Sequence, residues 1–286
     1  MQKVIIRNFT DPMMGLSYES EPELRRLETH FQEQLEIEYI MSGLVRDISD
    51  FMTSYEKSIP TEDGIKLYCS RLAQIYLQEK DIGGLPMNMD NFALFDSEHR
   101  SSYPLNIAYK AALLSSKEKA HSFLYRLRFA TIYQCRQTTS QEELLKIAVE
   151  CGLDRKQFQH HMDNGTALKK FEEDLTLTRA MKINSLPSYL ISYGQKAVLL
   201  NGVCDYDVIA NAIVTISDNQ IKPVRYTYSE EKLQKLIINH PLISISEILR
   251  SFDDLNIEKI KKAINSTLQR EHFKFIEENF IIHMIL

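Results

Sequence analysis

The most informative stretch of the chain is Asp11-Pro12-Met13-Met14-Gly15-Leu16-Ser17-Tyr18, followed by Glu21-Pro22. It comes directly after residues 3–9, an apolar run that is typical of a buried strand. A helix pattern follows it, with apolar residues on one face from Leu24 to Leu35. The stretch is therefore predicted to be a short loop that connects the end of a strand to the start of a helix.

This loop resembles the opening motif of the DsbA family of thioredoxin-like proteins, in particular its FrnE-like branch. The family motif reads Asp-Pro-x-Cys-x-x-Cys-aromatic-x-x-Glu-Pro, and this chain keeps five of its positions: Asp11, Pro12, Tyr18, Glu21 and Pro22. The resemblance implies a dithiol–disulfide oxidoreductase or isomerase. The two cysteine positions, however, hold Met14 and Ser17, which cannot form a disulfide. We expect a degenerate active site, Met14-Gly15-Leu16-Ser17, and assign no catalytic residue.

A second stretch carries the same resemblance. Leu186-Pro187 precedes the apolar run Tyr189-Leu190-Ile191. Thioredoxin-like folds place a cis-proline before a strand, opposite the redox loop, and the resemblance assigns that position to Pro187. Residues 189–200 are predicted to form a β-hairpin that turns at Gly194-Gln195, and residues 205–216 a closing helix.

The expected fold class is α/β, a thioredoxin-like fold with an inserted helical domain and a small C-terminal module. Residues 36–41 are predicted to be a second strand, parallel to the first. We expect a thioredoxin-like domain at 1–44 and 183–222, an inserted helical domain at 45–182, and a winged-helix-like module at 223–286. That module would contain three helices and a hairpin around Glu278-Asn279.

Capping boxes of the form Ser-x-x-Glu mark three of the expected helix starts. The predicted pairs are Ser20 with Glu23, Ser140 with Glu143, and Ser244 with Glu247.

Composition bears on the classes of partner. The formal charge is −5, from 34 Lys and Arg against 39 Asp and Glu with interspersed signs, so we expect neither nucleic acid nor an anionic membrane as partner. No run of ~18 apolar residues predicts a transmembrane helix. The N-terminus lacks a signal-peptide pattern, and the expected location is cytoplasmic.

Neither a cofactor nor a metal site is expected. The four cysteines (Cys69, Cys135, Cys151 and Cys204) lack the spacing of a redox pair or a zinc site and are interpreted as free thiols. His160-His161 near Asp163 is interpreted as a solvated helix end, because adjacent helix residues point in different directions.

The degenerate loop has two interpretations. In the first, a small hydrophobic groove binds a peptide or a protein partner through Met14, Leu16, Ser17, Tyr18, Leu186 and Pro187. In the second, these residues only fill the space that the cysteines left. Kappa-class glutathione transferases share the scaffold and use a serine, but at the position of Met14. Glutathione is therefore a less favoured ligand, and a helix cap is at least as good a role for Ser17.

The order of a DsbA-like body, Tyr206-Asp207-Val208 and a small helical tail also resembles the YjbH/SpxH family. Members of that family are adaptors that deliver a transcription factor to the ClpXP protease. The match is partial, because their cysteine-rich N-terminal segment is not found here. Two functions are therefore expected: a DsbA/FrnE-like protein without dithiol activity, or a non-catalytic adaptor that binds a protein or a peptide.

Overall fold

The computed structural model describes residues 2–260, 262, 273–276 and 280–283. Its central feature is a four-stranded mixed sheet in the order β2-β1-β3-β4. β1 (Val4–Thr10) pairs in parallel with β2 (Leu35–Met41) and antiparallel with β3 (Ser188–Tyr193), which continues through a hairpin into β4 (Lys196–Asn201). The predicted α/β class and thioredoxin-like sheet are confirmed.

Alternation along the strands creates two apolar faces. One face carries Val4, Ile6 and Ile191 and packs against α2 (Glu21–Phe31) and α10 (Tyr206–Ile216). The opposite face carries a small cluster of Phe9, Ile40 and Leu190, which Leu177, Met181, Ile183, Leu186 and Leu199 partly cover. The sheet is therefore covered as in a layered α/β fold.

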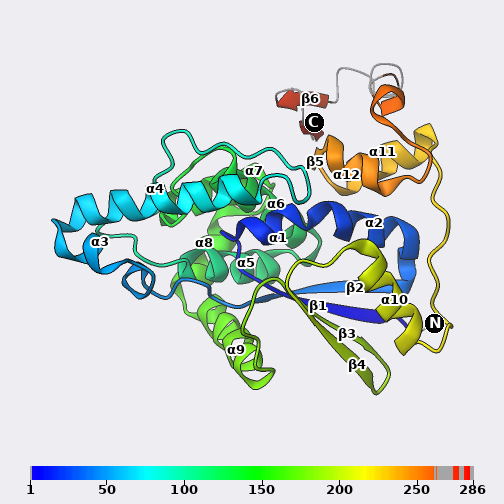
Figure 1. The fold of residues 1–286 in the computed structure, drawn as a ribbon, viewed down its shortest axis with the longest axis horizontal. Helices are drawn as coiled ribbons and strands as arrows, with labels where there is room; N and C mark the ends of the chain where they lie inside the picture. The colour runs from blue at the N-terminus through cyan, green and yellow to red at the C-terminus, as the bar shows by residue number, and fades with distance from the viewer. Residues whose placement is uncertain (1, 261, 263–272, 277–279, 284–286) are drawn as a thin grey trace.

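Helices fill the segment between β2 and β3. In chain order they are α3 (Ser54–Ser58), α4 (Thr61–Glu79), α5 (Tyr103–Ser115), α6 (Lys117–Ile132), α7 (Gln141–Glu150), α8 (Arg155–Asp163) and α9 (Thr166–Ala180). They build a large apolar core of their own, which also takes in Met13 and Tyr18 from the N-terminal motif. Figure 1 shows α3 and α4 extending away from the sheet, and a long loop returning from the end of α4.

The C-terminal part has a separate small core around Leu233, Ile237 and Ile248. It consists of α11 (Glu230–Asn239), β5 (Leu242–Ser244), α12 (Ile245–Ser251), β6 (Phe273–Ile276) and β7 (Phe280–His283), with strand order β5-β7-β6. The predicted third helix at 257–270 lies largely outside the described residues, as does the turn at Glu278-Asn279. α12 packs against α2, so α2 lies between the sheet and this part of the chain (Figure 1).

Two of the three predicted capping boxes are wrong. The helix after the motif starts earlier, as α1 (Gly15–Glu19), and Ser20 donates its hydroxyl hydrogen bond back to the Leu16 carbonyl at 2.7 Å instead of capping α2. Ser140 makes no side-chain cap, and the Glu143 carboxylate pairs with Arg136 and Lys146 instead of closing the box. The box of Ser244 and Glu247 is confirmed in both directions.

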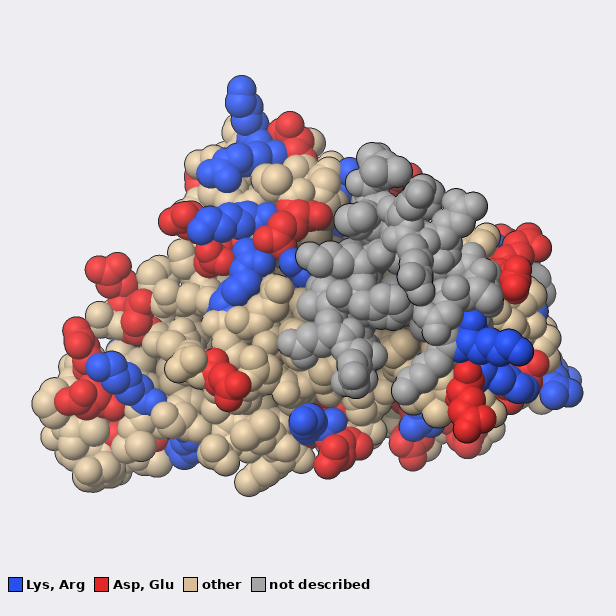
Figure 2. Space-filling view, turned by 90° about the horizontal axis from the view of Figure 1, so that it is seen from above, with Lys and Arg blue, Asp and Glu red and all other residues tan. Residues whose placement is uncertain are grey.

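The surface mixes charges of both signs. Figure 2 shows Lys and Arg side chains next to Asp and Glu over the visible described residues. Within the described part of the chain, no helix combines the length and the apolar character that crossing a bilayer requires.

Candidate functional site

Asp11 anchors the motif loop. Its side chain is fully buried; one oxygen accepts the backbone N–H of Met13 (3.0 Å) and the other that of Leu44 (2.7 Å). The second oxygen also accepts the Ser102 hydroxyl and the Asn106 amide, both at 2.8 Å. Burial raises the pKa of this carboxyl, and these hydrogen bonds partly offset the rise. The loop is thus tied to the segment that follows β2 and to the start of α5 without any contribution from sulfur.

Helix α4 lies directly on the motif. The Tyr76 hydroxyl donates a hydrogen bond to the Met13 carbonyl. A Cβ atom at Gly15 would lie 2.1 Å from Glu79 Oε2 and 2.6 Å from Tyr76 Cδ1, closer than any real contact. The glycine between Met14 and Leu16 therefore makes room for α4 at the place where a redox loop would be open to a substrate.

The loop after α4 covers helix α1. Glu19 Oε2 accepts the backbone N–H groups of Gly83 (2.6 Å) and Gly84 (2.9 Å). The Tyr18 hydroxyl donates to the Pro86 carbonyl at 3.3 Å. These bonds hold residues 83–86 against the first turn after the motif.

Helices α1 and α4 beside the motif carry three buried polar atoms without a hydrogen-bond partner among the described residues: Ser17 Oγ, Glu19 Oε1 and Glu79 Oε2. Burial raises the pKa of Glu19 and of Glu79 to about 7. The motif therefore lies beside two carboxyl groups whose pKa burial raises toward neutrality.

The six predicted groove residues differ in exposure. Met14, Leu16 and Leu186 are half-buried, whereas Ser17, Tyr18 and Pro187 are buried. Ser17 is buried in α1 and makes no cap. The groove itself stays a prediction.

The peptide bond before Pro187 is cis, as the resemblance implies. The register of β1 and β3 pairs Phe9 with Ser188, so Pro187 falls opposite Thr10, the residue before Asp11. Leu186, in contrast, packs toward Phe9 and Ile40 on the far face of the sheet. The two motifs thus meet at one end of the β1–β3 pair. Of Leu186 and Pro187, the register places only Pro187 beside the Asp11 loop.

A network of buried charges on α2 was not predicted from the sequence. Glu21 accepts a hydrogen bond from Arg128 on α6, which is itself fully buried. One turn later, Arg25 pairs with Glu247 on α12 at 3.2 Å, and the Tyr125 hydroxyl of α6 donates to the same carboxylate. The sequence did contain one indication of this network. Arg128 lies within the apolar run 123–132, and a charged residue on a buried face requires a buried partner.

The cysteines do not offer an alternative nucleophile. Cys69 and Cys204 are buried, and Cys135 and Cys151 are half-buried. Burial raises the pKa of Cys135 to about 11 and that of Cys151 to about 12. Thiols of this kind remain protonated at neutral pH, whereas redox-active cysteines have a lowered pKa.

His160 and His161 lie at the end of α8, where they contact Asn164 and Thr166. Within residues 2–260 and the other described positions, no three His, Cys, Asp or Glu side chains are grouped to hold a metal ion.

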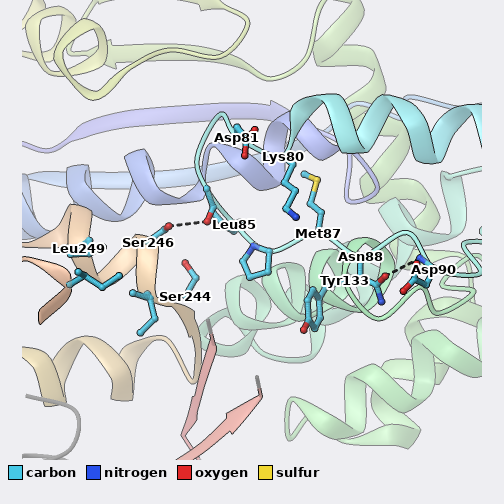
Figure 3. Close-up of a pocket in the computed structure, with 14 residues that line it drawn as sticks. Lys80, Asp81, Leu85, Met87, Asn88, Asp90, Tyr133, Ser244, Ser246 and Leu249 are labelled. Atoms are coloured by element: carbon cyan, nitrogen blue, oxygen red, sulfur yellow. Dashed lines mark hydrogen bonds between the residues drawn. The ribbon is translucent and has the colours of Figure 1, made fainter. Parts of the chain in front are cut away.

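Two of the clefts in the described part of the chain lie where the C-terminal part meets the rest of the protein. One, of about 490 Å³, lies between the loop at 80–90 and the start of α12, and Ser246 donates across it to the Gly84 carbonyl at 2.9 Å (Figure 3). The larger cleft, of about 770 Å³, lies between α2, α6, the end of α7 and residues 238–242. Neither of the two is lined by the predicted groove residues.

Comparison with curated proteins finds similarity along nearly the whole chain. The ClpXP adapter protein SpxH of Halalkalibacterium halodurans is 21% identical over 274 residues, which is 95% of this chain and 85% of the relative. The SpxH of Bacillus cereus ATCC 10987 is 21% identical over 218 residues, or 75% of this chain and 69% of the relative.

Solved structures show the same fold. A putative protein disulfide isomerase from Nitrosomonas europaea superposes with a TM-score of 0.63 at 14% identity, covering 77% of this chain and 100% of that one. The probable DsbA oxidoreductase SCO1869 from Streptomyces coelicolor has a TM-score of 0.55 at 13% identity, covering 79% and 94%. A family model described as Thioredoxin matches residues 8–211, which is more than half of the chain. The chain therefore belongs to the thioredoxin family, with a DsbA-like fold.

Proposed function

We propose that this protein is a non-catalytic adaptor, which uses a DsbA-like scaffold to hold another protein for the ClpXP protease. The observation that carries the proposal is the similarity to SpxH over 274 residues, which extends through the C-terminal part as well as the thioredoxin-like part. An adaptor needs binding surfaces and no reactive group, which agrees with Met14 and Ser17 at the two motif positions.

The surroundings of the motif support the loss of dithiol chemistry. α4 and residues 83–86 contact the loop that a dithiol enzyme presents to its substrate. The cysteines elsewhere have raised pKa values, so none supplies a thiolate at neutral pH. Thiol–disulfide exchange at the motif would require a thiolate and access of the substrate to the loop.

A ClpXP trap tests the adaptor role. ClpX with a proteolytically inactive ClpP is incubated with a lysate of the organism that encodes the chain, with and without the purified protein. We expect a small set of proteins to be retained in the trap only when the chain is present. Equal retention in both samples would contradict the proposal.

Restoring the thiols tests the catalytic part separately. The wild-type protein is expected to be inactive in insulin reduction. Activity of the Met14→Cys/Ser17→Cys variant in the same assay would show that the scaffold still supports thiol–disulfide exchange. Wild-type turnover at the rate of a working disulfide reductase would show that the missing cysteines had been misinterpreted.

A further inference from the structure

The larger cleft is built jointly by the thioredoxin-like part and the C-terminal part. Arg25 and Glu28 of α2 and Tyr39 of β2 line it on one side, and residues 118–126 and 150–151 line it on another. Residues 238–242, at the end of α11 and the start of β5, close the third side. Its volume of about 770 Å³ falls within the ~300–1,000 Å³ of typical binding pockets, which often occur where domains meet.

The main charged side chains of the cleft are already paired within the protein. Arg25 Nη1 lies 2.5 Å from Glu28, which also lies 3.1 Å from His240. Arg126 binds Glu150 at 2.7 Å, close to the opposite rim. A charged ligand would compete with these partners. Arg126 Nη1, however, is buried without a hydrogen-bond partner among the described residues, so the cleft suits an uncharged segment that can present a backbone carbonyl to it.

The cleft also has apolar side chains that remain exposed to solvent. Ile238 is 58% exposed, although the neighbouring aliphatic residues of α11, Leu236 and Ile237, are buried in the core of the C-terminal part. Pro241 and Leu242 beside it are half-buried. Burying one large aliphatic side chain contributes ~1.5–3 kcal/mol, so a bound segment would need several such contacts, from Ile238 and from its neighbours, to offset the cost of association.

The position of these residues connects the cleft with the adaptor proposal. The thioredoxin family match ends at residue 211, before residues 238–242, whereas the match to SpxH of Halalkalibacterium halodurans spans 95% of the chain. The apolar wall therefore belongs to the part of the chain that a thioredoxin scaffold alone does not supply.

We propose that this cleft binds an uncharged, aliphatic-rich segment of the captured protein, which packs against Ile238, Pro241 and Leu242. The proposal rests on the adaptor function and names the place and the chemistry of client recognition. Charged peptides, whether acidic or basic, are the alternatives that the test separates.

Peptide selection provides the direct test. A random 12-residue phage library is selected on the full chain, and the enriched peptides are synthesised with a fluorescent label for anisotropy titration. We expect peptides with two or more aliphatic residues and little charge. Ile238→Asp should weaken their binding about tenfold or more, because it places a charge against the buried aliphatic group. Ile238→Ala should weaken it less.

Val208→Asp is the matched control. Val208 is 48% exposed on α10 and does not line the cleft, so this variant should bind within about twofold of wild type. Thermal unfolding by circular dichroism checks that all three variants fold. A library that enriches only charged peptides or none, or peptides that bind Ile238→Asp as tightly as wild type, would overturn the proposal.

The ClpXP trap separates this proposal from the adaptor function. If Ile238→Asp retains the same proteins in the trap as the wild type, the cleft is not the client site, although the adaptor function stands. If the trap retains nothing and the selected peptides still depend on Ile238, the cleft binds aliphatic peptides, but the adaptor function fails and with it the assignment of the bound segment to a captured protein.

Discussion

At the scale of single residues, Gly15 shows how the motif differs from an open redox loop. Ala is usually favoured over Gly within a helix by ~0.5–1 kcal/mol. In α1 the added methyl group would overlap Glu79 and Tyr76 of α4. The sign of the Gly15→Ala effect therefore reports whether α4 is seated on the motif.

We expect Gly15→Ala to lower the free energy of unfolding by ~1–3 kcal/mol, the usual cost of overpacking. Urea unfolding followed by far-UV circular dichroism measures it. Ser70→Ala, on the exposed side of α4, is the control and should change stability by no more than ~0.5 kcal/mol. A Gly15→Ala variant more stable than wild type would show that α4 leaves room at the motif.

The two carboxyl groups beside the motif predict a pH dependence. Burial raises the pKa of Glu19 and of Glu79 from 4.5 to about 7. Between these values the folded chain holds protons that the unfolded chain has released. Their contribution to stability is therefore present at low pH and declines as the pH rises from 4.5 through 7.

The Glu19→Gln/Glu79→Gln variant should remove this decline, because Gln stays neutral at every pH. The melting temperature of the variant minus that of the wild type is expected to increase from pH 5 to about pH 7 and to level off by pH 8. Glu62→Gln, at an exposed position in the first turn of α4, serves as the control. A difference that stays constant over this range would refute the assignment.

At the scale of elements, α2 joins three parts of the molecule. Its Glu21 binds Arg128 of α6, and its Arg25 binds Glu247 of α12. Glu247 is fully buried and also accepts the N–H of Ser244 at 2.8 Å, so one carboxylate caps α12 and pairs with α2. Buried pairs are sensitive to the loss of one member, because the other is left as an uncompensated charge.

Glu247→Ala is accordingly expected to cost ~3–5 kcal/mol of stability. Lys170→Ala breaks an ion pair with Glu173 in which both side chains are about half-exposed, and should cost at most ~1 kcal/mol. Urea unfolding of both variants gives the comparison. Equal, small losses in the two variants would mean that Arg25 finds other partners when Glu247 is removed.

At the scale of the whole molecule, this network predicts that the C-terminal part does not open independently. The slowest-exchanging amides of α12 and α2 should report the same opening free energy in hydrogen exchange, since α12 cannot leave without breaking the buried pair of Glu247 with Arg25. In Glu247→Ala the amides of α12 should exchange faster than those of α2. Wild-type α12 amides that exchange far faster than those of α2 would contradict this coupling.

Local patterns were sufficient for most of the elements and failed where another hydrogen-bond or ion-pair partner competes. Ser244 and Glu247 form the predicted capping box, but Ser20 bonds to Leu16 and Glu143 is drawn to Arg136. A capping box is encoded within four residues, whereas the partner of a charged side chain is set by which helix packs beside it. The same reason explains why the role of Arg128 was missed.

The order of strands and helices and the motif with its lost thiols follow from short stretches of sequence, because hydrophobic period and turn residues act over a few positions. The cis bond at Pro187 was predicted from the family resemblance alone. Only the tertiary structure packs α4 against Gly15 and raises the pKa of Glu19 and Glu79 toward neutrality. It also forms the cleft between α2 and Ile238. These features depend on packing between segments tens to hundreds of residues apart, where burial rather than local preference determines which groups meet and which stay charged.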